Sequence, residues 1–218
     1  MRADEIFDLY GYKGSGSAAI EMALRAANLE YRVIEVASWD ADTPVERLGE
    51  LNPLKQIPTL VSPDGFVLTE SAAILIYLGL GWPSPELLPG DERLRARAIQ
   101  GMTYIVANCY SAVGIIDFPW RWTTSDSEAE QERIRAGTKA RLLSNWEIFA
   151  DMFPRECFLI NGKPGALDYL TATVTRMFSI RSALCESRPT FVDTLELIEH
   201  DRCVAEVVEE HWPAREGR

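Results

Sequence analysis

Two spacings of apolar residues divide the chain into an amino-terminal part with short strands and a carboxy-terminal part of helices only. In the first part, runs rich in β-branched and aromatic residues alternate with segments whose apolar residues recur at helical spacing. The expected strands are residues 5–10, 31–36, 59–62 and 66–68, and the expected helices are residues 17–27, a short helix after Thr43 and a helix from Ser71. The order is βαβαββα, with the first two strands parallel and the last two forming a hairpin.

Strand signals almost vanish after the proline-dense segment Trp82 to Asp91. The expected helices of this second part are residues 93–111, 127–153, 166–182 and 189–200, with a weaker one at 204–210. We therefore predict an α/β domain at residues 1–82, a linker at 83–91 and an all-helical domain at 92–218.

Two short signals locate helix ends in the first part. Thr43-Pro44-Val45-Glu46 has the sequence of a capping box with proline at the first helical position, which predicts a helix start. Asn28 follows the first expected helix, and asparagine tolerates the left-handed conformation found just past many helix ends.

Composition narrows the classes of protein that the chain could represent. The 218 residues are 47% hydrophobic and 25% charged, which is typical of a globular protein. A net charge of −11 at pH 7 disfavours nucleic-acid binding through a general basic field. No apolar run approaches the length of a membrane helix, and the start MRADEIFDLY lacks the apolar core of a signal peptide, so we expect a cytoplasmic protein without membrane contact.

Cysteine and histidine usage disfavours a metal site. Four widely separated cysteines form no Cys-x-x-Cys pair, which argues against zinc binding and against dithiol chemistry. The two histidines, His200 and His211, lie in charged carboxy-terminal segments, and we expect both to be exposed to solvent.

The glycine-rich stretch YGYKGSGSAA admits two interpretations. Gly14-x-Gly16-x-x-Ala19 follows an expected strand, and Glu35 stands downstream, as in a dinucleotide-binding turn. The alternative is a loop that presents the hydroxyls of Ser15 and Ser17. A dinucleotide-binding fold needs a longer series of parallel strands than this chain supplies, so the element order favours the hydroxyl loop.

The stretch LNPLKQIPTLVSPDGFVLTES contains a second candidate site. Pro58 begins an apolar strand, where it either opens an edge strand or forms a turn with a cis bond that frees the backbone of Ile57 for an extended ligand. Glu70 and Ser71 stand where a strand ends and a helix begins, so amide groups and a hydroxyl there either bind a carboxylate or simply cap the helix.

Together these stretches resemble the cytosolic glutathione transferases. The order LYGYKGS, NPLKQIPTL, DGFVLTESAAILIYL, proline-rich linker and helical half matches that family, most closely its serine-type group, which includes the zeta-like classes. The resemblance implies a thioredoxin-like first domain, a helical second domain and glutathione as co-substrate, without a metal. It also implies that Pro58 is a cis-proline and that the backbone of Ile57 pairs with the cysteinyl part of glutathione.

The same resemblance assigns the two ends of the glutathione molecule. Glu70 and Ser71 would hold its γ-glutamyl end. Lys55 and Gln56 would face its glycine carboxylate, which supplies a local basic contact in an acidic protein.

The resemblance gives Ser15 the catalytic position, where a hydroxyl donates a hydrogen bond to the glutathione sulfur. Such a bond favours the thiolate, and the adjacent helix start adds to the effect. Tyr12 and Ser17 remain rival donors, whereas Tyr10 is expected in the core. Gly16 stands where the cysteine-type classes carry their cysteine, which disfavours mixed-disulfide chemistry.

The electrophile would bind between this loop and the first helices of the second domain. The candidate pocket residues are Tyr12, Tyr104, Asn108 and Trp120, with Tyr110, Phe118 and Trp122 as further candidates for its wall. Farther along, Asp168 matches a buried helix-capping position of the family, but Gly165 replaces the usual serine or threonine cap.

The sequence therefore predicts an enzyme that activates the glutathione thiol for attack on a small hydrophobic electrophile, as in detoxification. Conjugation, addition and thiol-dependent isomerisation share this first step. The alternatives are a non-catalytic binding or interaction protein of the same fold and a glutathione-dependent reductase. By analogy with the family we expect a homodimer.

Overall fold

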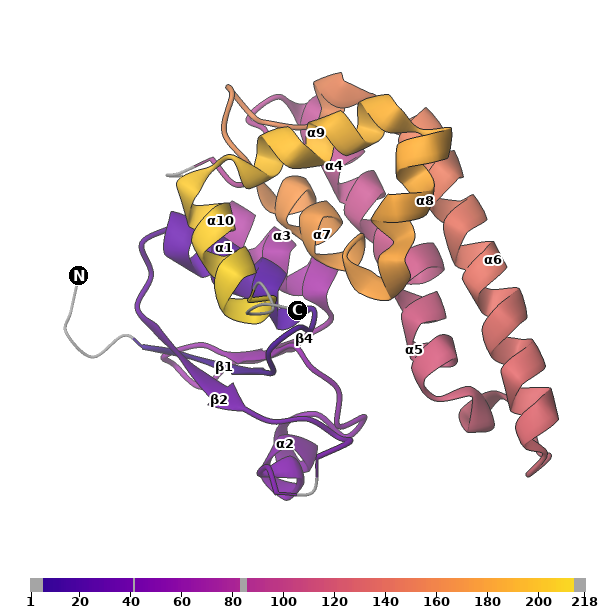
Figure 1. Cartoon of the computed structure of the whole chain (residues 1–218). Coiled ribbons are helices and arrows are strands. Elements are labelled where there is room, and N and C mark those ends of the chain that lie inside the picture. The colour runs from indigo at the N-terminus through magenta and orange to yellow at the C-terminus, as the bar shows by residue number, and fades with distance from the viewer. Residues whose placement is uncertain (1–5, 41, 83–85, 214–218) are drawn as a thin grey trace.

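A computed structural model of the chain describes residues 6–40, 42–82 and 86–213. The first domain contains β1 (Phe7–Gly11), α1 (Ser17–Ala26), β2 (Tyr31–Glu35), α2 (Val45–Leu51), β3 (Thr59–Val61), β4 (Val67–Thr69) and α3 (Ser71–Gly81). Figure 1 shows the sheet and α2 at the lower left and most of the remaining helices at the upper right, with α10 beside α1. Pro83 and Pro85 of the expected linker lie outside the described residues, and the exact domain limits stay a prediction.

The first domain is built on a mixed four-stranded sheet in the order β2-β1-β3-β4. β1 pairs with β2 in parallel and with β3 antiparallel, while β3 and β4 form an antiparallel hairpin. The predicted βαβαββα order is confirmed. A dinucleotide-binding fold is excluded for this domain, because that fold requires a largely parallel sheet.

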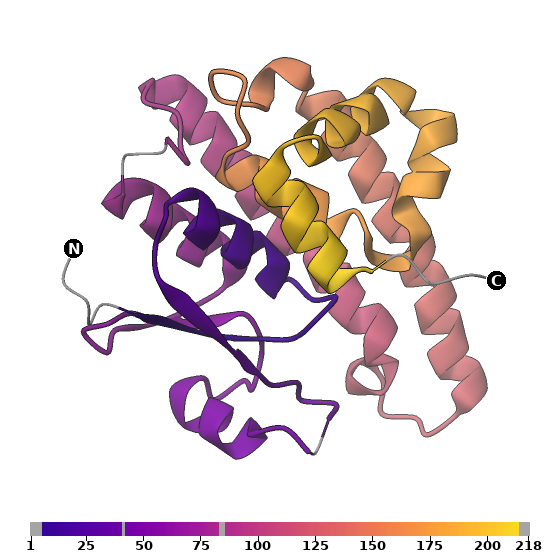
Figure 2. The same cartoon turned by 60° about the vertical axis from the view of Figure 1, so that its left-hand side comes forward.

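Helices cover both faces of the sheet, as Figures 1 and 2 show. α1 and α3 pack on one face and contact each other, and their buried side chains join one large core that extends into the second domain. On the other face, Tyr10 forms a small cluster with Val36 and with Leu48 of α2. Tyr10 is thus a core residue, as predicted.

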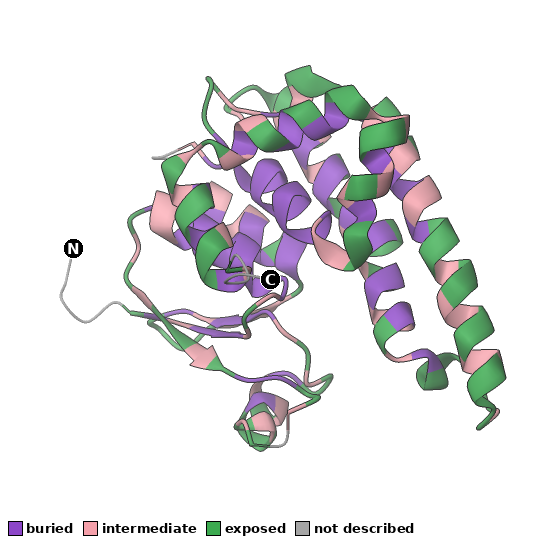
Figure 3. Cartoon of the chain, in the orientation of Figure 1, coloured by how far each residue is buried: buried purple, intermediate pink, exposed green. Residues whose placement is uncertain are grey.

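The second domain contains helices only within its described residues. They are α4 (Glu92–Tyr104), a π-helical segment (Ile105–Tyr110), α5 (Ser111–Asp117), a 3₁₀ turn (Pro119–Trp122), α6 (Glu128–Met152), a 3₁₀ turn (Arg155–Cys157), α7 (Ala166–Val174), a 3₁₀ turn (Met177–Ser179), α8 (Ile180–Ser187), α9 (Pro189–Glu199) and α10 (Arg202–His211). Helix α7 is buried along its whole length, which places it at the centre of this domain (Figure 3). The fold class predicted from the sequence is confirmed.

One predicted helix end is confirmed, and the helix expected after Thr43 is present as α2 but without the predicted side-chain cap. After α1, Asn28 has a φ of 51°, and the amides of Asn28 and Leu29 donate to the carbonyls of Arg25 and Leu24, which completes a Schellman motif. Before α2, the Thr43 hydroxyl instead bonds the backbone of Ala37 and Asp40, so it does not cap the helix.

The predicted helix at residues 166–182 is interrupted between α7 and α8. Phe178 and Ser179 have positive φ values of 54° and 57°. The Arg181 side chain donates to the Ala172 carbonyl, a backbone acceptor at the end of α7 that a continuing helix would have used, and it also donates to the Thr175 hydroxyl. A local helical pattern does not reveal this capping by a side chain from the next helix.

Asp168 holds the start of α7 from a fully buried position. Its two carboxylate oxygens accept hydrogen bonds from the amides of Gly165, at 2.9 Å, and Leu159, at 3.0 Å. A Cβ atom at Gly165 would lie 2.8 Å from the Leu87 carbonyl oxygen, so a serine or threonine cap would require a backbone shift. The acidic residue of the capping motif, Asp168, is therefore present and makes its expected bond. The close approach of the Leu87 carbonyl explains why position 165 is a glycine.

We expect Asp168 to make stability depend on pH. Burial raises its pKa from 3.8 to about 7, more than the two amide donors lower it, so the folded state binds this proton more tightly than the unfolded state. The contribution of Asp168 is therefore fully present below about pH 4 and falls by about 1.4 kcal/mol per unit as pH rises towards 7.

Urea unfolding of the native protein and of Asp168→Asn between about pH 4 and pH 7 measures this contribution, since asparagine does not titrate there. The stability advantage of the native protein should shrink as pH rises. Asp193→Asn, at an exposed position, is the matched control and should show no such trend. A difference between native protein and Asp168→Asn that is constant with pH would contradict the expectation.

The segment Glu92–Asp117 forms one continuous helical stretch that is long and apolar enough to cross a membrane by length and composition alone. In this structure α4 packs against α7, and α5 packs against α6. The cytoplasmic location stays a prediction.

Candidate functional site

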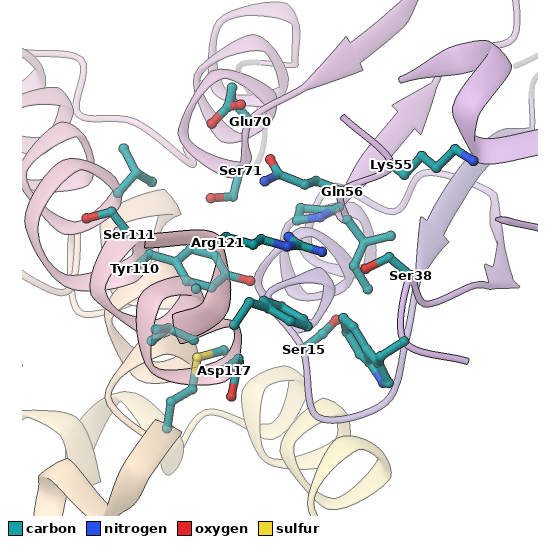
Figure 4. Close-up of a pocket in the computed structure, with 18 of the residues that line it drawn as sticks. Ser15, Ser38, Lys55, Gln56, Glu70, Ser71, Tyr110, Ser111, Asp117 and Arg121 are labelled. Atoms are coloured by element: carbon teal, nitrogen blue, oxygen red, sulfur yellow. The ribbon is translucent and has the colours of Figure 1, made fainter. Parts of the chain in front are cut away.

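A cavity of about 650 Å³ lies between the two domains. Its first-domain wall comes from the loop after β1, the turn before β3 and the start of α3, and its second-domain wall comes mainly from the segment 106–122. Ser15 and all six residues expected to bind glutathione line it, namely Lys55, Gln56, Ile57, Pro58, Glu70 and Ser71. Figure 4 shows residues of both walls facing the same space.

The turn before β3 is held in place by Asn52. The bond between Ile57 and Pro58 is cis, as the resemblance implied. The Asn52 amide, which is buried, donates to the Gln56 carbonyl at 3.0 Å and to the Thr59 hydroxyl at 3.2 Å. Asn52 also lines the cavity. Its hydrogen bonds fix the shape of this wall, a role that the sequence did not indicate.

Glu70 and Ser71 occupy the junction between β4 and α3. Glu70 has a φ of 66°, an uncommon conformation for a residue other than glycine, and Ser71 is buried as the first residue of α3. The side chain of Glu70 does not cap the helix, so amide groups at the start of α3 remain available to a ligand.

Lys55 lies at the opposite end of the same wall. Its ammonium pairs with Glu46 of α2 at 2.9 Å, and the two side chains are 40% and 93% exposed. An exposed pair of this kind is weak, so a ligand carboxylate can compete for the lysine.

The Ser15 hydroxyl lies at the start of α1. It accepts a hydrogen bond from the Ser17 amide at 3.2 Å and lies 3.0 Å from the Ser17 hydroxyl. Ser17 in turn donates to the Tyr12 carbonyl and is fully buried, so it braces the loop. Ser15 lines the cavity and Ser17 does not, which separates the two rival hydroxyls.

His211 anchors this loop from the far end of the chain, and the expectation that it is exposed is wrong. The Gly14 amide donates to its Nδ1 at 3.2 Å, and its Nε2 lies 2.7 Å from the buried Glu21 carboxylate of α1. Because Nδ1 accepts a hydrogen bond, the ring proton is on Nε2 and is donated to Glu21. His200, in contrast, is exposed as predicted. Only the packing of α10 on α1 could reveal this contact.

Tyr110 occupies the space beside Gly16. A Cβ atom at Gly16 would overlap the Tyr110 hydroxyl and lie 2.7 Å from its Cζ. Burial raises the pKa of Tyr110 to about 12, while the Gly16 backbone amide acts in the opposite direction. A cysteine at position 16 would therefore collide with this ring, which gives a steric reason for the glycine.

The four residues selected as the electrophile pocket do not line the cavity, and this expectation is corrected. The Tyr104 hydroxyl donates to the Asn145 carbonyl inside the second domain, and the Asn108 amide donates to the Tyr104 carbonyl. Trp120 packs its edge on Phe118 and is exposed. Tyr12 points to Asp40 and Trp39. The π-helical segment after Tyr104 changes which residues of the following helix point to the cavity. The spacing of apolar residues in the sequence does not reveal this change.

The further candidates Tyr110, Phe118 and Trp122 do line the cavity. The lining residues that the sequence did not indicate include Arg121, Met177 and Phe178. Arg121 stands among aromatic residues that carry the stronger pocket signal, and Met177 and Phe178 fall inside a segment whose pattern predicts a continuous helix. Trp39 also lines the cavity from the segment after β2, and its ring centroid is 6.4 Å from that of Phe118 across the domain boundary.

Comparisons with known proteins agree with this architecture. Residues 17–79 match the family model of the glutathione S-transferase amino-terminal domain. The chain is 33% identical over 129 residues to the GST-like protein YncG of Escherichia coli, covering 58% of this chain and 62% of that protein. It is 40% identical over 96 residues to a probable maleylacetoacetate isomerase of Caenorhabditis elegans, covering 42% and 43%. The chain thus spans less than two thirds of these curated relatives.

A solved structure is similar over nearly the whole chain. The glutathione transferase homologue from Sulfitobacter, determined with bound glutathione, superposes with a TM-score of 0.82 at 20% identity and covers 94% of this chain and 97% of that one. A likeness at this identity concerns the fold.

The molecule is therefore a thioredoxin-like domain joined to a helical domain, with a cavity between them. Its residues 17–79 match the glutathione S-transferase amino-terminal domain, and the chain has the fold of a solved glutathione transferase homologue. Its assignment to the serine-type group stays a prediction.

Proposed function

We propose that this protein is a glutathione transferase that activates the thiol of bound glutathione for attack on a small electrophile. The observation that carries the proposal is the convergence of Ser15 and the six expected glutathione-binding residues on one cavity. These residues come from three separate segments of the chain, and the sequence motifs alone assign them to one site.

Each part of glutathione has a complementary group on the first-domain wall. The free backbone of Ile57, next to the cis bond, pairs with the cysteinyl part as an added strand would. The γ-glutamyl end fits the start of α3, where the Glu70 carboxylate meets its ammonium group and Ser71 and the helix amides meet its carboxylate. Lys55 and Gln56 face the glycine carboxylate.

The sulfur then lies near the start of α1. The Ser15 hydroxyl donates to the thiolate, and the positive end of the α1 dipole stabilises the same charge. The bound thiol therefore ionises at a lower pH than the free thiol. The thiolate attacks the electrophilic carbon of the second substrate in the half of the cavity that the second domain lines.

Isomerisation and addition use the same thiolate. Similarity to a probable maleylacetoacetate isomerase supports isomerisation as an alternative reaction of this site. A reductase through a loop cysteine is disfavoured, because the described residues that line the cavity include no cysteine. Within the described residues, no group of three histidine, cysteine or acidic side chains could hold a metal ion. A homodimer in the cytoplasm, with a role in detoxification, completes the proposal.

The test is the ultraviolet thiolate absorbance of glutathione bound to the native protein, titrated with pH. We expect the thiol pKa to fall by about two units, which corresponds to about 2.7 kcal/mol. Glu70→Gln should weaken glutathione binding without moving the thiol pKa of the bound molecule. Glutathione that binds with an unshifted thiol pKa, or does not bind, would favour the non-catalytic interaction protein.

A further inference from the structure

The second-domain wall of the cavity carries a positive charge that the proposed glutathione site does not use. Arg121 lies in the 3₁₀ turn Pro119–Trp122, and its guanidinium stacks 4.2 Å from the ring centroid of Phe118. This stacking holds a long side chain in a defined position. Figure 4 shows Arg121 extending into the space between the Tyr110 side and the Gln56 side.

The two basic side chains of the cavity differ in their partners. Lys55 pairs with Glu46 and lies on the glutathione wall. Arg121 forms no ion pair with any described carboxylate, although the chain has 33 acidic residues against 22 basic ones. A guanidinium without a partner beside a binding cavity is suited to a ligand carboxylate, which it holds with two parallel hydrogen bonds.

The surroundings of Arg121 define the rest of such a ligand. The surface around Arg121 is largely apolar and aromatic, with Phe118, Trp122, Val113, Met177 and Phe178 from the second domain and Trp39 from the first. Asp117 is the acidic residue on this wall, and burial raises its pKa. Flat apolar surface with one fixed cation is complementary to an aromatic or unsaturated carboxylate.

We propose that the second substrate of this protein is an anionic electrophile, an aromatic or conjugated carboxylate whose carboxylate is held by Arg121 while its ring lies on Phe118 and Trp122. This inference rests on the proposed function and narrows its substrate class. Arg121 determines specificity by charge, and it acts on the electrophile rather than on glutathione.

A matched pair of probes separates charge from shape. In 4-chloro-3-nitrobenzoate and 4-chloro-3-nitrobenzamide, the glutathione thiolate attacks the carbon that carries chlorine. A carbon–sulfur bond forms, the carbon–chlorine bond breaks, and chloride leaves with the bonding electrons. The two compounds differ only in the carboxylate, and both nitroaromatic rings quench nearby tryptophan fluorescence, so binding is measurable apart from turnover.

We expect the glutathione-loaded native protein to bind the benzoate at least about tenfold more tightly than the benzamide, with a similar preference in kcat/KM. Arg121→Gln should abolish the preference through the benzoate alone, and Arg121→Lys should keep part of it. Arg133→Gln, an exposed arginine of α6 outside the cavity, is the control for overall charge and should keep the preference.

Equal binding of the two probes by the native protein, or an equal loss of both in Arg121→Gln, would overturn the inference. A weaker glutathione affinity in Arg121→Gln with the preference intact would overturn it too, since Arg121 would then contact glutathione. If both probes are converted with equal kcat/KM, the inference fails but the proposed function stands. Bound glutathione with an unshifted thiol pKa would contradict the proposed function itself.

Discussion

Replacement of Ser15 by alanine is expected to lower kcat/KM for thiol attack by about a hundredfold near neutral pH. The substitution removes the hydroxyl that lines the cavity at the start of α1 and leaves the helix dipole as the remaining support for the thiolate. The thiol pKa of bound glutathione should rise towards that of free glutathione. The rate deficit should therefore shrink at high pH, where the thiol ionises without help.

Two hydroxyl variants control for a loss of loop structure. Ser17→Ala removes the bond to the Tyr12 carbonyl and one partner of Ser15, so it should lower stability more than it moves the thiol pKa. Tyr110→Phe tests the hydroxyl beside Gly16. If Ser15→Ala leaves the thiol pKa low, and one of the rival variants or Tyr12→Phe raises it, the catalytic assignment passes to that residue.

The first domain could be predicted from sequence because its signals are local. Strand alternation, the hairpin turn and the Asn52 to Pro58 motif each concern neighbouring residues, and the structure has them where they were expected. The first-domain wall of the cavity could be predicted for the same reason, since its predicted residues occur in two short motifs and one loop.

The second-domain wall depends on contacts between distant segments and could not be predicted in the same way. The phase change at Ile105–Tyr110 decides which residues after Tyr104 face the cavity, and Asn108 is exposed to solvent outside the cavity lining. Arg181 ends α7 from the next helix and so brings Phe178 to the cavity. The pattern of apolar and polar residues along the sequence predicts neither of these features.

His211 is the strongest case of such a distant contact, and its replacement by phenylalanine is expected to lower the free energy of unfolding by about 3 kcal/mol. The phenylalanine leaves the Gly14 amide without an acceptor and the buried Glu21 carboxylate without the Nε2–H donor. Arg25 and Tyr31 contact the same carboxylate more distantly, at 3.9 and 3.4 Å, and compensate only in part. Urea unfolding measures the loss.

The two histidines of the chain make this prediction unusually specific. His200→Phe is the matched control, because His200 is exposed, and it should change stability by less than about 0.5 kcal/mol. His211→Gln offers one acceptor and one donor and should lose less than His211→Phe. Nitrogen NMR of the native protein should show the His211 proton on Nε2 at neutral pH, and a proton on Nδ1 would contradict the contact with Gly14. Since Gly14 precedes Ser15 directly, His211→Phe should also raise the thiol pKa of bound glutathione, whereas a stability loss with an unchanged thiol pKa would confine His211 to holding α10 on α1.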